Sequence, residues 1–487
     1  MTIFEFGKNH SRSKRPPLTG NIYKNSNYRT LQIVFVISTF LLCNPTVLIA
    51  ADQSPIKEMS DTVEALCPKL AALNTAGQLS AAQQDVFLRC REVKIQPGED
   101  FTDLTDADLD ALDNMTSTQT SSMNRVTVEF AGPQVATVTG RMQALRAGNV
   151  GGLAMQMNAQ PVEPVYYAGP ITDSPSDSSS SASSSIWNHG RLGMFVNGSF
   201  GTGNRDQTEY EPGFDYDAYS VTAGVDYRFT NNLVVGTALG YAFSEADIDN
   251  DGGSAESDGY GASLYATYYI SEFYIDLIGV YGKKDYSTVR NVDYSIVEFG
   301  GGGTTVVDQS FNGDPDAEEY GFSAGLGYSF FKWGFTLQPY GQLSYLDTEI
   351  DGYSESLDQA NTDAGFGLAL AFDEQDITSL TSALGARLAY TVNTSLGVIV
   401  PHISFDWQHE YENDSRNITA RFVNGIDDVD NLIVIPTDDP DRDYYRLGAG
   451  CSAVLPHGVS AFASYETLIG LADISSHLVT IGMRYEF

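Results

Sequence analysis

The last eleven residues of the chain, 477–487, alternate between two kinds of side chain. One face carries Val479, Ile481, Met483, Tyr485 and Phe487, and the other carries mostly small or polar residues. This period of two predicts a β-strand with one apolar face. Its length matches a tilted strand that crosses a membrane, which needs about 9 to 11 residues. A soluble sheet can show the same alternation, so the assignment depends on whether the pattern repeats upstream.

The same alternation recurs throughout residues 191–487. Segments 215–229 and 318–331, for example, have aromatic residues at the ends of an apolar face and many glycine, serine or threonine residues on the other. A membrane barrel needs this combination of an apolar outer band with aromatic borders and a small, polar inner face. We expect twelve strands, near 191–200, 215–229, 233–248, 258–270, 273–290, 318–331, 334–350, 378–392, 396–411, 442–455, 458–469 and 476–487.

The expected connections alternate in length along the chain. Five are short and six are longer, and several of the longer ones are acidic. Bacterial outer-membrane barrels have an even number of strands, short periplasmic turns and long extracellular loops. The sequence therefore predicts an all-β fold, a 12-stranded antiparallel transmembrane β-barrel with a small helical N-terminal segment. Such a chain lies in the outer membrane of a Gram-negative bacterium, in contact with outer-membrane lipid.

Charge and hydropathy exclude two other classes of protein. The net charge is −36, and much of the acidity lies in the predicted loops, of which 247–258 and 427–443 are examples. This charge argues against binding nucleic acid, which would require contacts between basic groups and phosphates. A helical membrane protein is excluded because each membrane-spanning helix needs about 20 apolar residues. Apart from the apolar run near the N-terminus, no run is long enough to form such a helix. The acidic loops are interpreted as a solvated surface.

The N-terminus has the features of a secretory signal. A basic stretch precedes the apolar run 31–43, and Ala50 and Ala51 follow it. Residues 1–51 are thus predicted to be a signal peptide with an extended n-region that the secretory translocon reads, with an uncleaved anchor as the alternative. Residues 52–150 are predicted to form a short helical, passenger-like segment. Residues 151–190, rich in Gly, Pro and Ser, read as a flexible linker, and the barrel occupies 191–487.

Two cysteines in the predicted helical segment are candidates for a disulfide. Cys67 and Cys90 lie in two helical patterns, 57–73 and 81–93. In an oxidising periplasm a bridge between them would staple a helical hairpin that is too small to hold itself together by core burial. A loop of 23 residues closed in this way is stabilised by about 3 kcal/mol in the chain-entropy account. Cys451 falls on an outward face and is expected to be an isolated thiol.

Two local motifs suggest chemistry. Residues 321–325 match the G-x-S-x-G nucleophile pattern around Ser323, but that motif requires a sharp strand-to-helix turn, and here it lies within a predicted strand. The spacing of Asp247, Asp249, Asp251 and Asp258, with a glycine after the third, resembles a calcium loop, in which alternating oxygen ligands suit a hard cation. An acidic hairpin tip is the alternative for this second motif. No other cofactor is expected.

The barrel segment, its alternation of short turns and long loops, and the closing residues 483–487 resemble the autotransporter β-domain family. The resemblance implies that Tyr485 and Phe487 form the assembly signal read by the barrel-assembly machinery. It also implies that a helix preceding the barrel crosses the lumen. Residues 135–146 resemble part of such a helix, with Arg141 and Arg146 available to lumen acids such as Asp226 or Glu486.

The function that follows from the resemblance is surface display or translocation of a short N-terminal segment. We expect adhesion, and not catalysis, to be the role of that segment. A barrel-embedded hydrolase and a narrow diffusion pore are the alternatives. Twelve strands leave room for a narrow pore only if nothing fills the lumen. Conductance separates a pore from a plugged barrel, and hydrolysis of generic esters would expose an enzyme.

Overall fold

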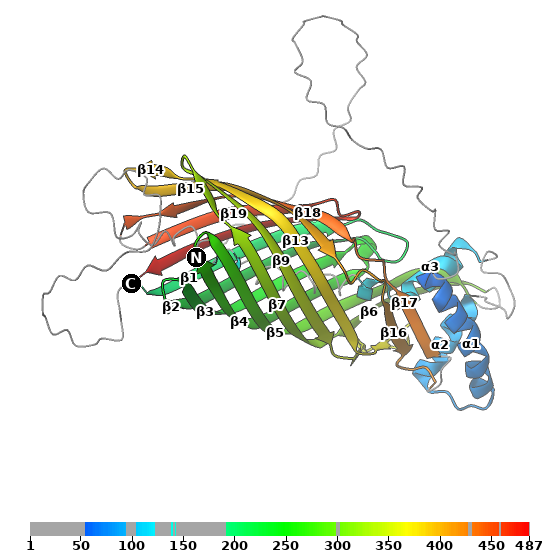
Figure 1. Cartoon of the computed structure of the whole chain (residues 1–487). Helices are drawn as coiled ribbons and strands as arrows, with labels where there is room; N and C mark the ends of the chain where they lie inside the picture. The colour runs from blue at the N-terminus through cyan, green and yellow to red at the C-terminus, as the bar shows by residue number, and fades with distance from the viewer. Residues whose placement is uncertain are drawn as a thin grey trace, which may run out of the picture. The chain divides into compact units, whose positions relative to one another are not determined.

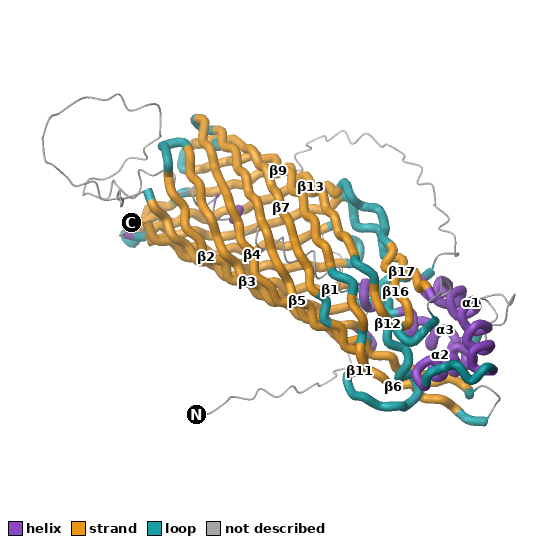
Figure 2. The backbone as a smooth tube through the Cα atoms, turned by 90° about the horizontal axis from the view of Figure 1, so that it is seen from below, coloured by secondary structure: helices purple, strands orange, loops and turns teal. Residues whose placement is uncertain are grey.

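A single sheet closes into a barrel in the computed structural model, in which the described residues are 54–93, 104–121, 138–139, 142, 191–298, 302–426, 431–456 and 459–486. The predicted signal peptide 1–51 and linker 151–190 lie outside these residues. Each barrel strand pairs antiparallel with the next along the chain, and the first pairs with the last (Figures 1 and 2). The twelve barrel strands are β1 (Leu192–Arg205), β2 (Phe214–Arg228), β3 (Leu233–Ile248), β4 (Gly253–Ile270), β5 (Phe273–Val297), β7 (Asp316–Tyr328), β9 (Phe335–Ile350), β13 (Gln375–Tyr390), β15 (Gly397–Glu410), β18 (Asp443–Val454), β19 (Val459–Ile469) and β20 (Ile474–Glu486).

One end of the barrel has only short turns. Two short strands, β8 (Phe330–Lys332) and β14 (Val392–Thr394), extend β7 and β13 to this end. Between β8 and β9, Trp333 and Gly334 have φ angles of 53° and 81°. Positive φ at both central residues is typical of the tight hairpin turn whose twist suits neighbouring strands. The twelve predicted strands are confirmed. Their bounds shift at the opposite end, where β1, β4 and β5 continue beyond the predicted segments because they stay paired there.

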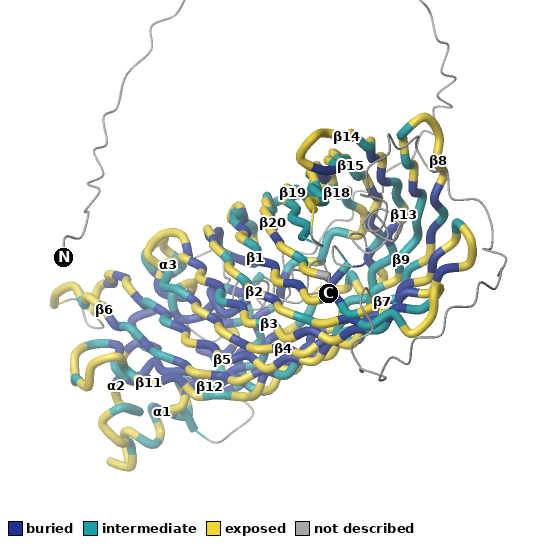
Figure 3. Tube along the Cα trace, turned by 90° about the vertical axis from the view of Figure 1, so that its left-hand side faces the viewer, coloured by how far each residue is buried: buried dark blue, intermediate teal, exposed yellow. Residues whose placement is uncertain are grey.

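The two faces of the wall differ as the sequence predicts. Val221, Leu239 and Ile481 point outward and are 57, 69 and 60% exposed, whereas Thr222 and Ser323 point inward and are buried. Buried and exposed residues alternate along most of the strands (Figure 3). An apolar outer face stabilises the barrel only in contact with lipid, and a polar inner face requires water or protein inside.

The long-loop end carries strands of its own. β5 continues to Val297 and pairs with β6 (Thr304–Gly313), which pairs with β11 (Ser356–Leu357). A separate four-stranded sheet has the order β10 (Tyr353–Ser354), β12 (Leu370–Phe372), β16 (Asn417–Phe422) and β17 (Leu432–Pro436). We call these loop structures the platform, which comprises residues 291–297, 304–313, 353–373, 417–426 and 431–436.

The helices α1 (Pro55–Thr75), α2 (Ala81–Glu92) and α3 (Asp106–Thr116) lie in the described residues 54–93 and 104–121. Each begins at a hydroxyl residue, Ser54, Ser80 or Thr105, whose side chain accepts a backbone N–H of the first turn. We call residues 54–93 and 104–121 the helical subdomain. It lies beside β6, β16 and β17 at the long-loop end (Figures 1 and 2). Among the described residues, no helix is long and apolar enough to span a membrane.

The closing seam of the barrel leads to a prediction about Gly482 of β20. A Cβ atom at this position would lie 2.1 Å from Oδ1 of Asn197 in β1 and 2.3 Å from the Phe462 ring in β19. Gly482→Val should therefore overpack the seam, at a cost of about 1–3 kcal/mol, and reduce the fraction of compact, heat-modifiable barrel on gels. Gly198→Ala on β1, where the nearest atom is 3.7 Å away, is the control. Equal folded fractions for the two variants would contradict the prediction.

Candidate functional site

The helical subdomain and the platform share one hydrophobic core. On α1, Met59, Val63, Leu66 and Leu70 follow helical spacing and are all buried. The platform supplies apolar residues from β5, β6, β12, β16 and β17 to the same cluster. The buried residues of the cluster are Met59, Val63, Leu66, Leu70, Val86, Phe87, Cys90, Val93, Ala111, Leu112, Met115, Val292, Tyr294, Ile296, Val307, Phe311, Leu368, Ala369, Leu370, Phe372, Ile418, Ala420, Phe422, Ile433 and Ile435.

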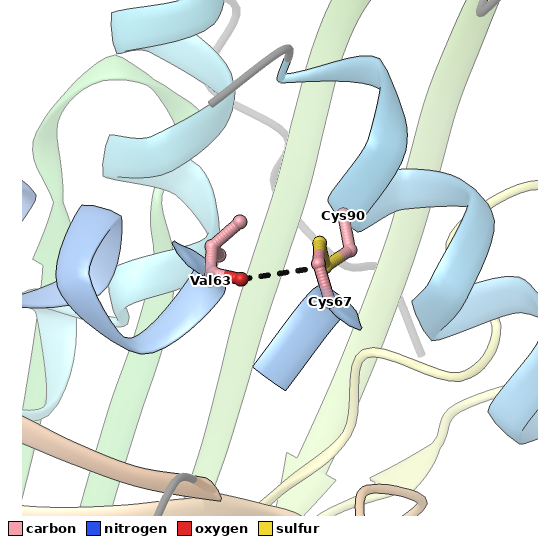
Figure 4. The surroundings of a disulfide bond; sticks show 3 residues. All are labelled: Val63, Cys67 and Cys90. Atoms are coloured by element: carbon pink, nitrogen blue, oxygen red, sulfur yellow. Dashed lines mark hydrogen bonds between the residues drawn. A yellow bond between two sulfur atoms is a disulfide. The ribbon is translucent and has the colours of Figure 1, made fainter. Parts of the chain in front are cut away.

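A disulfide joins the first two helices. The sulfur atoms of Cys67 in α1 and Cys90 in α2 are bonded, with their Cα atoms 5.9 Å apart (Figure 4). This separation lies within the usual range for a disulfide. The carbonyl oxygen of Val63 lies 3.7 Å from Sγ of Cys90. Cys90 belongs to the shared core, so the bridge fixes α2 against α1 on the side that packs against the platform. Cys451 is a free, exposed thiol.

Arg290 of β5 joins three parts of the molecule. Its Nε and one terminal nitrogen donate to the two carboxylate oxygens of Glu355, at 2.8 and 2.6 Å. Further N–H groups donate to the carbonyl oxygens of Leu368 in the platform and Asn114 in α3, at 3.0 and 3.4 Å. The guanidinium also lies 4.8 Å from the centre of the Phe311 ring. A buried bidentate pair is directional as well as strong, so Arg290 sets the position of the platform and of α3 relative to the barrel wall.

A polar stripe on α2 meets the platform. Asp85, Arg89 and Glu92 are all buried. The Asp85 carboxylate accepts the N–H groups of Gly365 and Gly367 at 3.2 and 2.9 Å. Glu92 accepts the hydroxyl of Thr305 at 2.7 Å. Within the stripe, Arg89 pairs with both carboxylates.

Burial changes the pKa of the Glu92 carboxyl group on α2. Loss of contact with water raises the pKa of Glu92 above its usual value, and the hydrogen bond from Thr305 and the positive charge of Arg89 oppose that shift. Burial disfavours the charged carboxylate, and a donor or a cation favours it. The Glu92 carboxylate can therefore be buried because Thr305 of the platform and Arg89 stabilise its charged form.

Residues that precede the barrel also lie inside it. Val138 and Met142 have helical backbone and are almost completely buried. Their spacing places them on one helical face. They pack against inward side chains of β1, β3, β4 and β5, including Phe195, Val234 and Tyr265.

Thr139 lines a lumen cavity together with Asp276, Tyr340, Gln342 and Arg387. It comes from the segment 135–146 for which the sequence predicted a lumen helix. Arg141 and Arg146 of that segment lie outside the described residues, as does the side chain of Glu486. The Asp226 carboxylate is buried and accepts the hydroxyl of Tyr265 at 3.2 Å. The described part of this segment therefore lies among both apolar and polar lumen residues.

The G-x-S-x-G motif does not form a nucleophile turn. Ser323 lies in the middle of β7 and points into the lumen. Its hydroxyl accepts the Gln342 amide at 2.8 Å and lies 3.1 Å from the Ser344 hydroxyl. A nucleophile elbow needs a strained strand-to-helix turn and backbone donors for an oxyanion. Ser323 is instead part of a neutral hydrogen-bond cluster on the inner wall.

The four aspartates with calcium-loop spacing are not brought together. Asp247 lies in β3, Asp249 and Asp251 lie in the 3₁₀ turn Asp249–Asp251, and Asp258 lies in β4. Asp258 pairs with Phe243 and not with the tip, where Asp247 pairs with Ser254. Four residues of strand separate the two levels by about 13 Å. Among the described residues, no group of three or more His, Cys, Asp or Glu is arranged to hold a metal.

One residue of the expected assembly signal, Tyr485, belongs to the described part of β20. Tyr485 lies on β20, points outward and is 44% exposed, beyond Val479, Ile481 and Met483 on the same face. Phe487 lies outside the described residues. The outward face of β20 therefore follows the sequence prediction up to Tyr485.

Sequence reasoning missed the platform. Its strands fall mostly in segments that the sequence predicts to be long loops. A signal was present, since Ile418, Ala420 and Phe422 alternate with polar residues and are buried in β16. Their burial depends on the neighbouring strand β17 and on β12 and α1, which come from more distant parts of the chain. A local period of two predicts a strand but not what covers it.

Comparison with known protein families identifies the family of the barrel. The Autotransporter beta-domain profile matches residues 194–466. The chain belongs to the autotransporter β-domain family. Autotransporter barrels are outer-membrane proteins of Gram-negative bacteria, so this chain is one as well. Its short turns accordingly lie in the periplasm, and its long loops, which form the platform, are extracellular.

Individual relatives of this autotransporter barrel match parts of their own length. Esterase EstA of Pseudomonas aeruginosa is 26% identical over 305 residues, which cover 62% of this chain and 43% of the esterase. An uncharacterized protein from the trpE-trpG intergenic region of Pseudomonas putida is 27% identical over 203 residues, which cover 41% of this chain and 31% of that protein. The chain thus spans less than half the length of these curated relatives.

Solved structures of translocator domains are similar at low identity. The translocator domain of autotransporter NalP from Neisseria meningitidis is 15% identical with a TM-score of 0.47, over 62% of this chain and 90% of that one. The β-domain of the Bordetella autotransporter BrkA is 18% identical with a TM-score of 0.38, over 61% of this chain and 100% of that one.

Arg290 provides a quantitative prediction for the site. Arg290→Met leaves the buried Glu355 carboxylate without its charge partner, which should destabilise the platform by about 3–5 kcal/mol. It also removes the hydrogen bond to the Asn114 carbonyl of α3, so amide exchange in α3 should become faster. Hydrogen exchange of the α3 amides measures this change. The exposed platform pair Arg421 and Asp373 is a matched control, because Arg421→Met should cost less than about 1 kcal/mol. Similar effects from the two substitutions would show that Arg290 does not set the position of α3.

Proposed function

We propose that this autotransporter barrel delivers residues 54–121 to the cell surface and holds them there on its own extracellular loops. The observation that carries the proposal is the docking of α1, α2 and α3 at the long-loop end through a shared hydrophobic core. The course of the chain supports it. The helical subdomain lies at the extracellular mouth, Val138 and Met142 lie in the lumen, and β1 begins with Leu192 at the periplasmic end. This order, with the helices at the long-loop end and later residues in the lumen, is the arrangement expected after display through the barrel and supports the proposal.

The role we propose for the displayed segment is contact with another surface, as in adhesion, and not catalysis. Its exposed part includes the turn between α1 and α2, residues 74–78, which is free of charged side chains. The rival is a hydrolase, because one relative is named an esterase. Ester hydrolysis needs a nucleophile activated by a neighbouring base, whereas the hydroxyl of Ser323 is engaged by Gln342 and Ser344. Hydrolysis of generic esters by the purified full chain would favour the rival.

Display can be tested with an epitope tag inserted at Gly77. This residue is exposed, has a φ of 68° and has no atom within 4 Å of an added Cβ, so the turn should accept an insertion. An antibody should bind the tag on intact cells. The same tag placed at Asn231, in the short turn between β2 and β3, should become accessible only after the outer membrane is permeabilised. A Gly77 tag that also requires permeabilisation would contradict surface display.

The second candidate function, a diffusion pore, is favoured by the polar lumen and opposed by the residues inside it. A chain that begins at Trp187 lacks Val138, Thr139 and Met142, and we expect it to conduct ions in a planar bilayer much better than the full chain does. A second variant that lacks only residues 54–121 keeps the lumen residues and tests the helical subdomain alone. We expect this variant to conduct almost no ions. Equal, large conductance from all three would favour the pore.

A further inference from the structure

We propose that the platform is the folding template of the helical subdomain, so that the three helices acquire a stable structure only when they are docked on the extracellular loops. The inference rests on the proposed display function and adds how the displayed segment is structured and retained. It identifies the platform as an interaction surface and a segment of the same chain as its occupant.

The distribution of the shared core is the first observation. More than half of the buried residues in the cluster belong to the platform. Removed from the platform, α1, α2 and α3 would expose Met59, Val63, Leu112 and Met115 to water or would have to bury them against one another. A domain of this size buries too little apolar surface to be more than marginally stable even when its core is complete. The missing half of the core therefore lies in the platform.

The polar stripe of α2 is the second observation. Asp85, Arg89 and Glu92 occupy the side of the helix that docking buries. The neutral donors to the two carboxylates, the N–H groups of Gly365 and Gly367 and the Thr305 hydroxyl, all belong to the platform. A buried carboxylate without donors is strongly destabilising, and one with donors is tolerated. This side of α2 suits the platform and would be a poor core for three helices on their own.

Backbone complementarity is the third observation. A Cβ at Gly367 would lie 2.4 Å from the carbonyl oxygen of Ala82 in α2 and 3.1 Å from Cγ2 of Val86. Gly365, with a φ of 91°, turns the chain so that its N–H reaches Asp85. The loop around Gly367 follows the backbone of α2 at a distance that only glycine permits.

The test uses the purified full chain with the Cys67–Cys90 bridge intact. Gly367→Ala should push α2 off the platform. Amide hydrogen exchange should then be at least about tenfold faster in all three helices. The effect should include α1 and α3, although the contacts of Gly367 described above are with α2. Barrel strands should keep their protection. Gly279→Ala on β5, where an added Cβ meets no atom within 4 Å, is the matched control and should behave as the unaltered chain.

The N–H of Gly365 reports docking, because it donates to Asp85. If this N–H loses protection in Gly367→Ala while the helices keep theirs, the helical subdomain folds on its own and the proposal is wrong. If docking survives, Gly367→Phe repeats the test with a larger side chain. Unchanged exchange at Gly365 and in the helices for both variants would also overturn the proposal.

A failure of the template is distinguishable from a failure of display. The Gly77 tag on intact cells reports where the segment is, and exchange reports whether it is folded. An accessible tag with helices that stay protected after undocking refutes only the template. A tag that is inaccessible in the unaltered chain refutes display and the template with it.

Discussion

Closure of the sheet is the constraint on which the rest of the structure depends. In hydrocarbon a backbone N–H or C=O without a partner costs several kcal/mol, so a sheet that crosses a membrane cannot have a free edge. Here β1 and β20 are paired from Gly193 and Glu486 to Arg205 and Ile474. The close packing of Gly482 against Asn197 and Phe462 lets these strands meet. Everything that the extracellular loops do is built on this closed wall.

The two ends of the barrel solve different physical problems. At the periplasmic end the chain only has to reverse direction, and turns such as Trp333 and Gly334 do so in two residues. At the extracellular end the strands rise beyond the membrane and need new partners for their backbones and apolar faces. In the platform, β6 pairs with the extension of β5, while β10, β12, β16 and β17 pair with one another in a separate sheet, and the helical subdomain covers the apolar faces. Arg290 links both to the wall with a single side chain.

The barrel could be predicted from the sequence because its signal is local. On β20, Val479, Ile481, Met483 and Tyr485 all point outward, as a period of two requires. The cysteine pair could be proposed from the compartment and the two helical patterns. The platform could not be predicted, because the burial of residues such as Ile418 and Phe422 also requires β12 and helices that lie far away in the chain. The aspartate spacing could not reveal the β3–β4 hairpin, which places Asp258 four residues along the strand from the level of Asp247.

The shared core changes how freely the surface of this protein can vary. Extracellular loops usually accept substitutions and insertions because little packs against them. In this chain, residues such as Val307, Leu368 and Gly367 pack against helices that are encoded far upstream. A substitution in one partner then requires a compensating one in the other. Two regions that lie far apart in the sequence should therefore change together among related proteins, and the exposed turns around them should vary more freely.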